Sequence, residues 1–174
     1  MITIVVGTNR QEAISRVLAN IYQTLLTEQD VACQVVDMHE LPSDFLSTAL
    51  YENVGQNEVV NRLGERLAES EKVVFIVPEY NSSFPGILKI FIDALPYPSP
   101  LLGKKCALVG LSAGVQGGGL ALSHFTDVLN YLGAHVLAAK PKLAFIQRHL
   151  QETALTNALY RELLEEQVKQ LIVF

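Results

Sequence analysis

The feature that most constrains this chain is an apolar run that stops abruptly at a polar segment. Residues 73–77, Val-Val-Phe-Ile-Val, are all β-branched or aromatic and show no polar alternation. Such a run is typical of a parallel strand that is covered on both faces. Pro78 then ends it, because proline has no N–H for the strand ladder. The sequence therefore predicts a buried strand of an α/β sheet, followed directly by a polar loop.

The polar loop at residues 79–83 carries a carboxylate, a phenol, a carboxamide and two hydroxyls. Open α/β sheets bind ligands at the carboxyl ends of their strands, so we expect a binding loop here. Pro85 favours a first helical turn, and Gly86 permits close approach, at the start of a helix predicted from 85 to about 94. The alternative is that the prolines and Gly86 only shape a tight strand-to-helix turn.

A second candidate loop follows the first apolar run, residues 2–6. Gly7, Thr8 and Arg10 precede an amphipathic stretch whose apolar residues at 14, 17, 18, 21, 22 and 25 share one helical face. The unpaired N–H groups and the dipole at a helix N-terminus favour an anion, and a phosphate monoester fits such a site. Neither a P-loop nor a dinucleotide-binding fingerprint is present.

A third loop follows a predicted strand at residues 106–111. Ser112 opens it, and residues 112–119 contain four glycines, which indicates close backbone approach or positive φ. Further strands are predicted at 31–38 and 134–139. Further helices are predicted at 58–70, with Asn57 as the N-cap, at 120–132, ended by Gly133, and at 151–171.

Five apolar strands alternating with helices predict one α/β domain over residues 1–174. The sheet is expected to be doubly wound and parallel, with helices on both faces. Site loops after strands one, three and four suit the strand order 2-1-3-4-5, whose switch point lies between strands one and three. This order would put Cys33 and Cys106 about 14 Å apart, too far for a disulfide. Both are expected to be buried apolar residues.

The spelling Pro-Glu-Tyr-Asn-x-Ser-x-Pro-Gly-x-Leu-Lys-x-x-Ile-Asp, residues 78–93, closely resembles the signature of the NAD(P)H-dependent FMN reductase family. That family includes quinone, azo-dye and chromate reductases, and the resemblance covers residues 1 to about 139. It implies a flavodoxin-like fold that binds FMN. It further implies that NADPH or NADH is the co-substrate, that a small molecule accepts the electrons, and that no catalytic side chain is needed.

The resemblance also implies cofactor contacts residue by residue. Ring-side contacts, largely through the backbone, would come from Pro78, Glu79, Tyr80, Asn81 and Ser83. The phosphate loop would include Thr8 and Arg10, and the loop over the outer edge of the ring would include Ser112, Gly114, Gly117 and Gly118. Ala13 departs from the pattern, because many members carry serine there, and Ser15 is the candidate for a substitute contact. Residues 140–150 also depart from it.

Composition excludes several classes of protein. The net charge of −5 provides no basic patch for nucleic acid or an anionic membrane. The chain does not open like a signal peptide, and no apolar run reaches the ~18 residues of a membrane helix, so we expect a cytoplasmic protein. Four scattered histidines and two distant cysteines show no metal-ligand spacing.

Two other functions fit parts of the sequence. Residues 110–114 spell Gly-x-Ser-x-Gly, as in a serine hydrolase with Ser112 as nucleophile, and Asp127 and His135 or His149 follow in the right order. The chain is short for that class, and the two other loops would have no role. A flavin-free or electron-carrying member of the flavodoxin-like fold is the second alternative, which Ala13 keeps open.

The helix predicted after the central loop is apolar on nearly every face across residues 87–95. A helix of this kind must be buried all round, and one sheet covers only one side. We therefore expect a homodimer, with a homotetramer as the larger possibility. The contact would involve residues 87–97 and 120–132, with His124 or Tyr131 at its polar rim.

Overall fold

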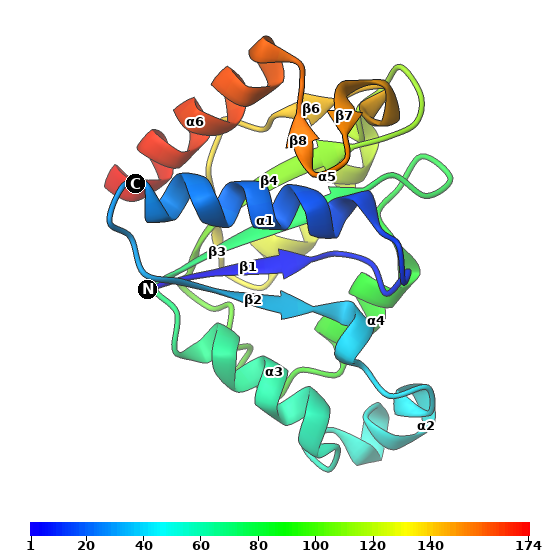
Figure 1. Cartoon of the computed structure of the whole chain (residues 1–174). Coiled ribbons are helices and arrows are strands. Elements are labelled where there is room, and N and C mark those ends of the chain that lie inside the picture. The colour runs from blue at the N-terminus through cyan, green and yellow to red at the C-terminus, as the bar shows by residue number, and fades with distance from the viewer.

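A computed structural model describes residues 1–174 and shows a parallel sheet with the order β2-β1-β3-β4-β5 (Figure 1). The strands are β1 (Ile2–Val6), β2 (Cys33–Asp37), β3 (Lys72–Pro78), β4 (Lys105–Leu111) and β5 (His135–Val136). The predicted flavodoxin-like order is confirmed. Residues 73–77 are fully buried, as their uniform apolar character predicts.

The fifth position of the sheet differs from the prediction. In place of one strand over 134–139 there are two short strands, β5 and β6 (Lys142–Leu143). β5 pairs with Lys105 and Cys106 at the start of β4, whereas β6 pairs with Gly110 and Leu111 at its end. Pro141 lies directly before β6 and has no N–H to donate, which interrupts a continuous ladder.

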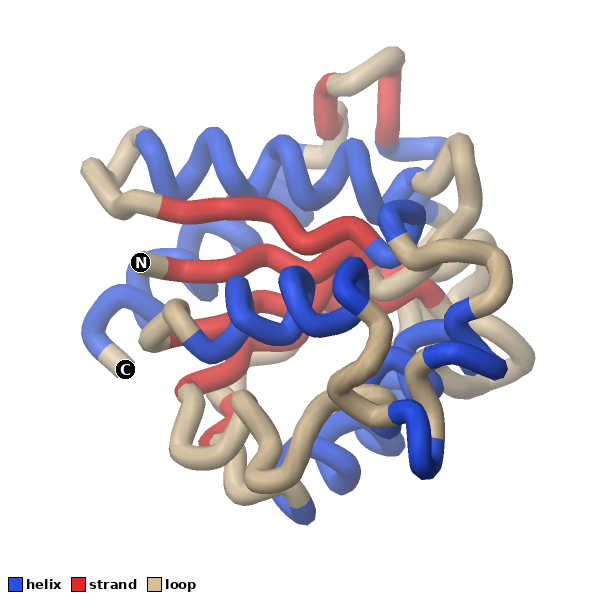
Figure 2. Tube along the Cα trace, turned by 90° about the horizontal axis from the view of Figure 1, so that it is seen from below, coloured by secondary structure: helices blue, strands red, loops and turns tan.

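Helices cover both faces of the sheet. α1 (Ile14–Thr27) and α6 (Ala158–Val173) pack on one face, and α3 (Glu58–Ala68), α4 (Gly86–Asp93) and α5 (Gly119–Tyr131) form a core with the other (Figure 1). Along β1, Ile4 and Val6 face the first layer and Val5 the second, as the period of two requires. Figure 2 views the same layers from below, and in both views the two termini lie close together.

Local capping signals account for several helix ends. The Asn57 side chain accepts from the N–H groups of Val59 and Val60, which confirms the predicted N-cap of α3. Gly133, with φ of +80°, follows α5 and donates to the carbonyl of Asn130. Two short elements, α2 (Phe45–Thr48) and a 3₁₀ turn at Tyr51–Asn53, fill the segment before α3.

The start predicted for the last helix is wrong. Residues 150–155 form a small antiparallel hairpin, β7 (Leu150–Gln151) and β8 (Ala154–Leu155), which turns through Glu152 at a φ of +53°. α6 begins only at Ala158, where the Asn157 side chain accepts from the N–H of Tyr160. The apolar spacing that includes Leu155 is equally compatible with a hairpin residue that packs on the core.

The chain itself covers most of α4. Leu88, Phe91 and Ile92 are buried, and Ile87 and Ile90 are half-buried against the same core. The chain's own core therefore covers more of this helix than one sheet face would, and the homodimer stays a prediction. No helix of the structure combines the length and the apolar character that crossing a membrane requires.

At the amino ends of the strands, which we call the amino edge of the sheet, lysine side chains donate hydrogen bonds to the last carbonyls of two helices. The Lys72 ammonium is buried and donates to the carbonyls of Leu171 and Ile172, 2.9 and 2.8 Å away, in the last turn of α6. The Lys104 ammonium donates to the carbonyls of Ala68 and Ser70 at the end of α3. Cys33 and Cys106 lie on β2 and β4, with two strands between them, and burial raises the pKa of the Cys106 thiol to about 12.

Candidate functional site

The three predicted loops meet at a cavity of about 170 Å³ at the carboxyl ends of β1, β3 and β4. Predicted site residues that line it are Thr8, Arg10, Ser15, Pro78, Glu79, Tyr80 and Ser112. Predicted site residues outside the lining are Asn81, Ser83, Gly114, Gly117 and Gly118. The topology thus brings the phosphate loop to the first residues of the other two loops.

The N-terminus of α1 has no cap. Ala13 is the N-cap residue and provides no side-chain acceptor. The backbone N–H groups of residues 11–15 donate to no acceptor in the chain. The Ser15 hydroxyl also lacks a partner, although only 1% of this residue is exposed and it lines the cavity. No fully buried side-chain polar atom is left unpaired in the chain, so the Ser15 hydroxyl opens into the cavity that it lines. Together with the free N–H groups, it fits an anion bound at the helix N-terminus.

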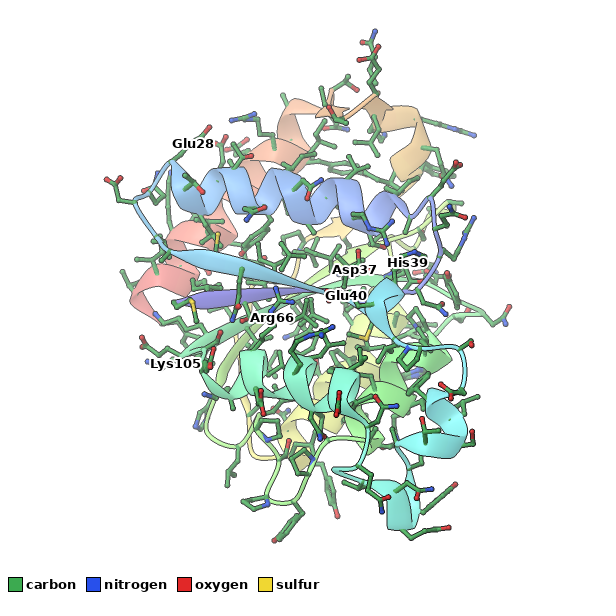
Figure 3. All side chains as sticks on the ribbon, turned by 60° about the horizontal axis from the view of Figure 1, so that its bottom comes forward. Glu28, Asp37, His39, Glu40, Arg66 and Lys105 are labelled. Atoms are coloured by element: carbon green, nitrogen blue, oxygen red, sulfur yellow. The ribbon has the colours of Figure 1, made fainter.

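Carbonyl groups of the same loop accept hydrogen bonds from neighbouring side chains. Arg16 donates to the carbonyl of Gln11 and forms an ion pair with Asp37 at the end of β2. The hydrogen bond with Asp37 raises the pKa of Arg16. Nδ1 of His39 lies 3.2 Å from the carbonyl oxygen of Asn9. Figure 3 shows Asp37 and His39 beside Glu40 at this end of β2. The loop is therefore held through its acceptors, while its donors stay free.

Arg10 is the cation of the cavity. Its side chain is exposed and forms no ion pair within the chain, and its backbone N–H lies 3.4 Å from the Thr8 hydroxyl. Glu12 also lines the cavity and works against an anion there. The site thus combines one free guanidinium and a helix N-terminus with one opposing carboxylate.

The loop after β3 is a tight turn. Tyr80 and Ser83 exchange two backbone hydrogen bonds of 2.8 and 3.0 Å. Asn81 and Ser82 between them have φ of +49° and +59°, as in a type I′ turn. Asparagine tolerates this conformation better than most residues. The residue type at position 81 therefore has a backbone explanation as well as the predicted ligand contact, and Asn81 is exposed at the tip.

Side chains of this loop tie it to its two neighbours. The Tyr80 phenol lies 2.8 Å from the Thr8 hydroxyl on the phosphate loop. The Glu79 carboxylate accepts from the N–H of Gly118, 3.2 Å away, at the N-terminus of α5. These residues were predicted as ring-side contacts largely through the backbone, and that role stays a prediction. Their side chains join the three loops into one unit.

The glycine-rich loop is shaped by the fold. The Ser112 hydroxyl donates to the carbonyl of Gly114 and accepts from the N–H of Gly117, both at 2.9 Å. Gly117 has φ of +59°, and a Cβ there would lie 2.7 Å from the backbone of Lys142. Gly118, with φ of +83°, is the N-cap of α5. Gly117 and Gly118 are thus required by the backbone conformation and packing, whatever they contact in a ligand.

The geometry contradicts the serine hydrolase alternative. The Ser112 hydroxyl is bonded within its own loop, and no histidine bonds to it. His135 pairs with Lys105 at the opposite end of β4, and Nδ1 of His149 lies 3.4 Å from the Asn157 side chain. A nucleophile needs a base within hydrogen-bond reach, and none is present here.

Sequence reasoning missed the segment of the cavity wall at Ile146 and Gln147. The N–H groups of Phe145 and Ile146 donate to the carbonyls of Gly114 and Ser112, which fixes this segment against the glycine-rich loop. The only signal was the apolar run after Pro141, in a region that departs from the family pattern. Ser83, outside the cavity, instead lies 3.0 Å from Nδ1 of His124 on α5.

Comparison with known proteins identifies the family to which the chain is similar. A sequence model of the family described as NADPH-dependent FMN reductase matches residues 1–145. A 2-hydroxy-1,4-benzoquinone reductase of a Burkholderia species is 32% identical over 145 residues, which is 82% of this chain and 76% of the relative. A quinone reductase of Pseudomonas putida is 34% identical over 120 residues, 67% of this chain and 62% of the relative. This chain therefore aligns with less than two thirds of the second relative's length.

Solved structures support the same assignment. FerB, a flavoenzyme NAD(P)H:(acceptor) oxidoreductase from Paracoccus denitrificans, has a TM-score of 0.79 at 26% identity, over 99% of this chain and 94% of that one. The NADH:FMN oxidoreductase EMOB in its apo form has a TM-score of 0.80 at 19% identity, over 99% and 88% of the two chains, which shows the fold alone. The sequence match, the fold and the converging loops together show that the chain belongs to the NADPH-dependent FMN reductase family.

Proposed function

We propose that this protein binds one FMN per chain and passes electrons from NADPH or NADH to a small quinone-type acceptor. The observation that carries the proposal is the free donor set at the start of α1, formed by the N–H groups of residues 11–15 and the Ser15 hydroxyl. A phosphate monoester accepts several hydrogen bonds at once and is favoured by the helix dipole. Arg10 adds a charge-assisted donor.

The cavity volume indicates which part of the cofactor it would enclose. Cofactor sites typically measure about 300–1,000 Å³, whereas this cavity measures about 170 Å³. It suits the phosphate end and the adjoining sugar-alcohol chain. The family resemblance assigns the ring to residues 78–83, and the exposed turn at Asn81 and Ser82 leaves that surface open to an acceptor.

The chain's own residues would bind and orient the cofactor. Bound FMN supplies hydride and electron transfer chemistry, which no protein side chain provides. The titratable side chains of the cavity are Arg10, Glu12, Glu79 and Tyr80, and two of these have structural partners in Gly118 and Thr8. We therefore expect no single side chain to be indispensable for turnover, in keeping with the absence of a predicted catalytic residue.

The acceptor class comes from the relatives named as quinone reductases. The test is purification of the protein followed by a visible absorption spectrum, then oxidation of NADPH and of NADH with and without 1,4-benzoquinone. A flavin spectrum and quinone-dependent oxidation are expected. A protein that takes up no FMN supports the flavin-free alternative, and FMN binding without turnover supports the electron carrier.

We also propose that the protein forms a homodimer through a groove between α4 and α5. The groove measures about 470 Å³ and is lined mainly by apolar atoms, including those of Ile92, Leu95 and Val128. Tyr97 and Tyr131 stand at its edge, 99% and 91% exposed. An apolar surface of this kind is typical of an interface. Sedimentation at micromolar concentration tests it, because a mass near 19.2 kDa would show a monomer.

A further inference from the structure

Ile146 and Gln147 line the cavity, and the segment that carries them is bonded both to the glycine-rich loop and to α6. Ser112 donates its N–H to the carbonyl of Leu143, and the N–H of Ile146 returns to the carbonyl of Ser112. The Tyr160 phenol on α6 donates to the carbonyl of Ala144, 3.0 Å away. The Ile146 side chain is buried in the core. The next residue, Gln147, is therefore presented to the cavity from a fixed backbone.

Gln147 lines the cavity together with Ala13 and Ser15, and its carboxamide has no hydrogen-bond partner in the chain. Its neighbour Arg148 is engaged elsewhere, because its guanidinium lies 4.7 Å from the centre of the Phe145 ring and it does not line the cavity. Gln147 is thus the one side chain of this wall segment that offers a free polar group to the cavity, since Ile146 is apolar.

The phosphate loop, which lines the same cavity as Gln147, offers few side-chain donors to it. Ala13 contributes only a methyl group to the cavity, and Glu12 contributes a negative charge. The side-chain donors of that loop and helix start that line the cavity are the Ser15 hydroxyl, the Thr8 hydroxyl, which is already bonded to Tyr80, and Arg10. The carboxamide of Gln147, an exposed residue that lines the same cavity, can donate two hydrogen bonds. It can therefore supply a contact that the phosphate loop lacks at position 13.

We propose that Gln147 is a specificity-determining residue for the cofactor, whose carboxamide N–H donates to the FMN phosphate and favours FMN over riboflavin. This inference rests on the proposed function, and it assigns a binding role to a residue beyond the 145 that match the family. A hydrogen bond to a charged oxygen is stronger than one between neutral groups. Affinity for the phosphate end of FMN should therefore depend on Gln147, while affinity for the rest of the cofactor should not.

The test compares dissociation constants of the apoprotein for FMN and for riboflavin, measured by quenching of flavin fluorescence. The variants are Gln147→Ala, which removes the donor, and Gln147→Glu, which has nearly the same shape but places a negative charge beside the phosphate. Gln151→Glu is the matched control, because it adds the same charge on the exposed hairpin outside the cavity. Thermal unfolding of each apoprotein checks that the fold is kept.

We expect Gln147→Ala to raise the Kd for FMN about tenfold, the lower range for a charge-assisted hydrogen bond. Gln147→Glu should raise it further, and both variants should leave the Kd for riboflavin within about twofold. Gln151→Glu should change neither. Equal losses for both flavins, or no change in Gln147→Ala, would overturn the role of Gln147 alone. Failure of the wild-type protein to bind either flavin would instead overturn the proposed function, and this role with it.

Discussion

Helix ends at the amino ends of the strands differ from those at the carboxyl ends in how their backbone groups are bonded. At the amino edge, Lys72 and Lys104 satisfy the last carbonyls of α6 and α3. At the carboxyl edge, Asn57 and Asn157 cap α3 and α6. α1, α4 and α5 begin at this edge without a side-chain cap, and of these three only the start of α1 lines the cavity. This helix end, inside a cavity and without a protein partner, is the proposed position of the ligand.

The comparison extends to the loops around α1. Arg16 and His39 bond to carbonyls of residues 9–11, so the loop is ordered without use of its donors. Tyr80 and Glu79 then join it, directly or through α5, to the other two loops. The carboxyl edge therefore combines cross-linked loops with a set of free donors, whereas at the amino edge lysines bond to the last carbonyls of α3 and α6. Substitutions at the two edges should accordingly separate stability from binding.

The largest expected effect is a loss of stability from a substitution in the glycine-rich loop at the carboxyl edge. Gly117→Ala should lower the free energy of unfolding by about 3 kcal/mol, because alanine is strained at φ of +59° and its Cβ would meet the backbone of Lys142. Urea unfolding of the apoprotein measures this. Gly114→Ala is the control, since a Cβ at Gly114 meets nothing within 4 Å, and it should cost under about 0.5 kcal/mol. Equal costs for both would show that the loop is not tightly packed.

Removal of the Arg10 guanidinium should weaken FMN binding and leave the free energy of unfolding nearly unchanged. Arg10→Ala should weaken FMN binding by about 1.5–3 kcal/mol, the range for a charge-assisted hydrogen bond, with no loss for riboflavin. Because Arg10 forms no ion pair in the chain, the free energy of unfolding should stay within about 0.5 kcal/mol. Calorimetric titration with each flavin decides between this result and an unspecific effect, in which both flavins would lose affinity together.

The opposite pattern is expected at the amino edge. Lys72→Met keeps much of the side-chain volume but leaves the carbonyls of Leu171 and Ile172 without their donor. The free energy of unfolding should fall by about 2 kcal/mol, and the Kd of the folded protein for FMN should not change. Urea unfolding and flavin titration on the same sample measure both quantities. A change in FMN affinity would show that the two edges are coupled, which the comparison does not predict.

The smallest effect concerns the bond between two loops. Tyr80→Phe removes the hydroxyl that lies 2.8 Å from the Thr8 hydroxyl and should lower the free energy of unfolding by about 1 kcal/mol. Thr8→Val serves as the partner variant, and the double variant should lose little more than either single one. Strictly additive losses would show that the two hydroxyls contribute separately to stability.

Much of the fold could be predicted because the sequence signals for its strands and helix ends are local. The uniform apolar runs at 73–77 and 106–111 are compatible with little but buried strands, and Asn57 sits directly before the residues that it caps. The position of the loop before α1 was equally predictable, since its features lie within a few residues of one helix start, and its contact with a phosphate stays a prediction. Three site loops after strands one, three and four then restrict the strand order to the one observed.

The remaining features depend on contacts between distant segments. Ile146 and Gln147 reach the cavity only because their neighbours bond to the loop at residues 112–114. Glu79 and Tyr80 were recognised as polar loop residues, but a sequence does not show that their partners are Gly118 and Thr8. The hairpin at 150–155 was taken as helix because short apolar spacings fit either structure.

The central claim is that the free backbone donors of α1 bind the cofactor's phosphate. The most direct measurement is a titration of the ¹⁵N-labelled apoprotein followed by the amide resonances of residues 11–15. FMN should shift these resonances and slow their hydrogen exchange, inorganic phosphate should shift them in the same direction, and riboflavin should leave them in place. Equal shifts with riboflavin, or no response of residues 11–15 to FMN, would contradict the account.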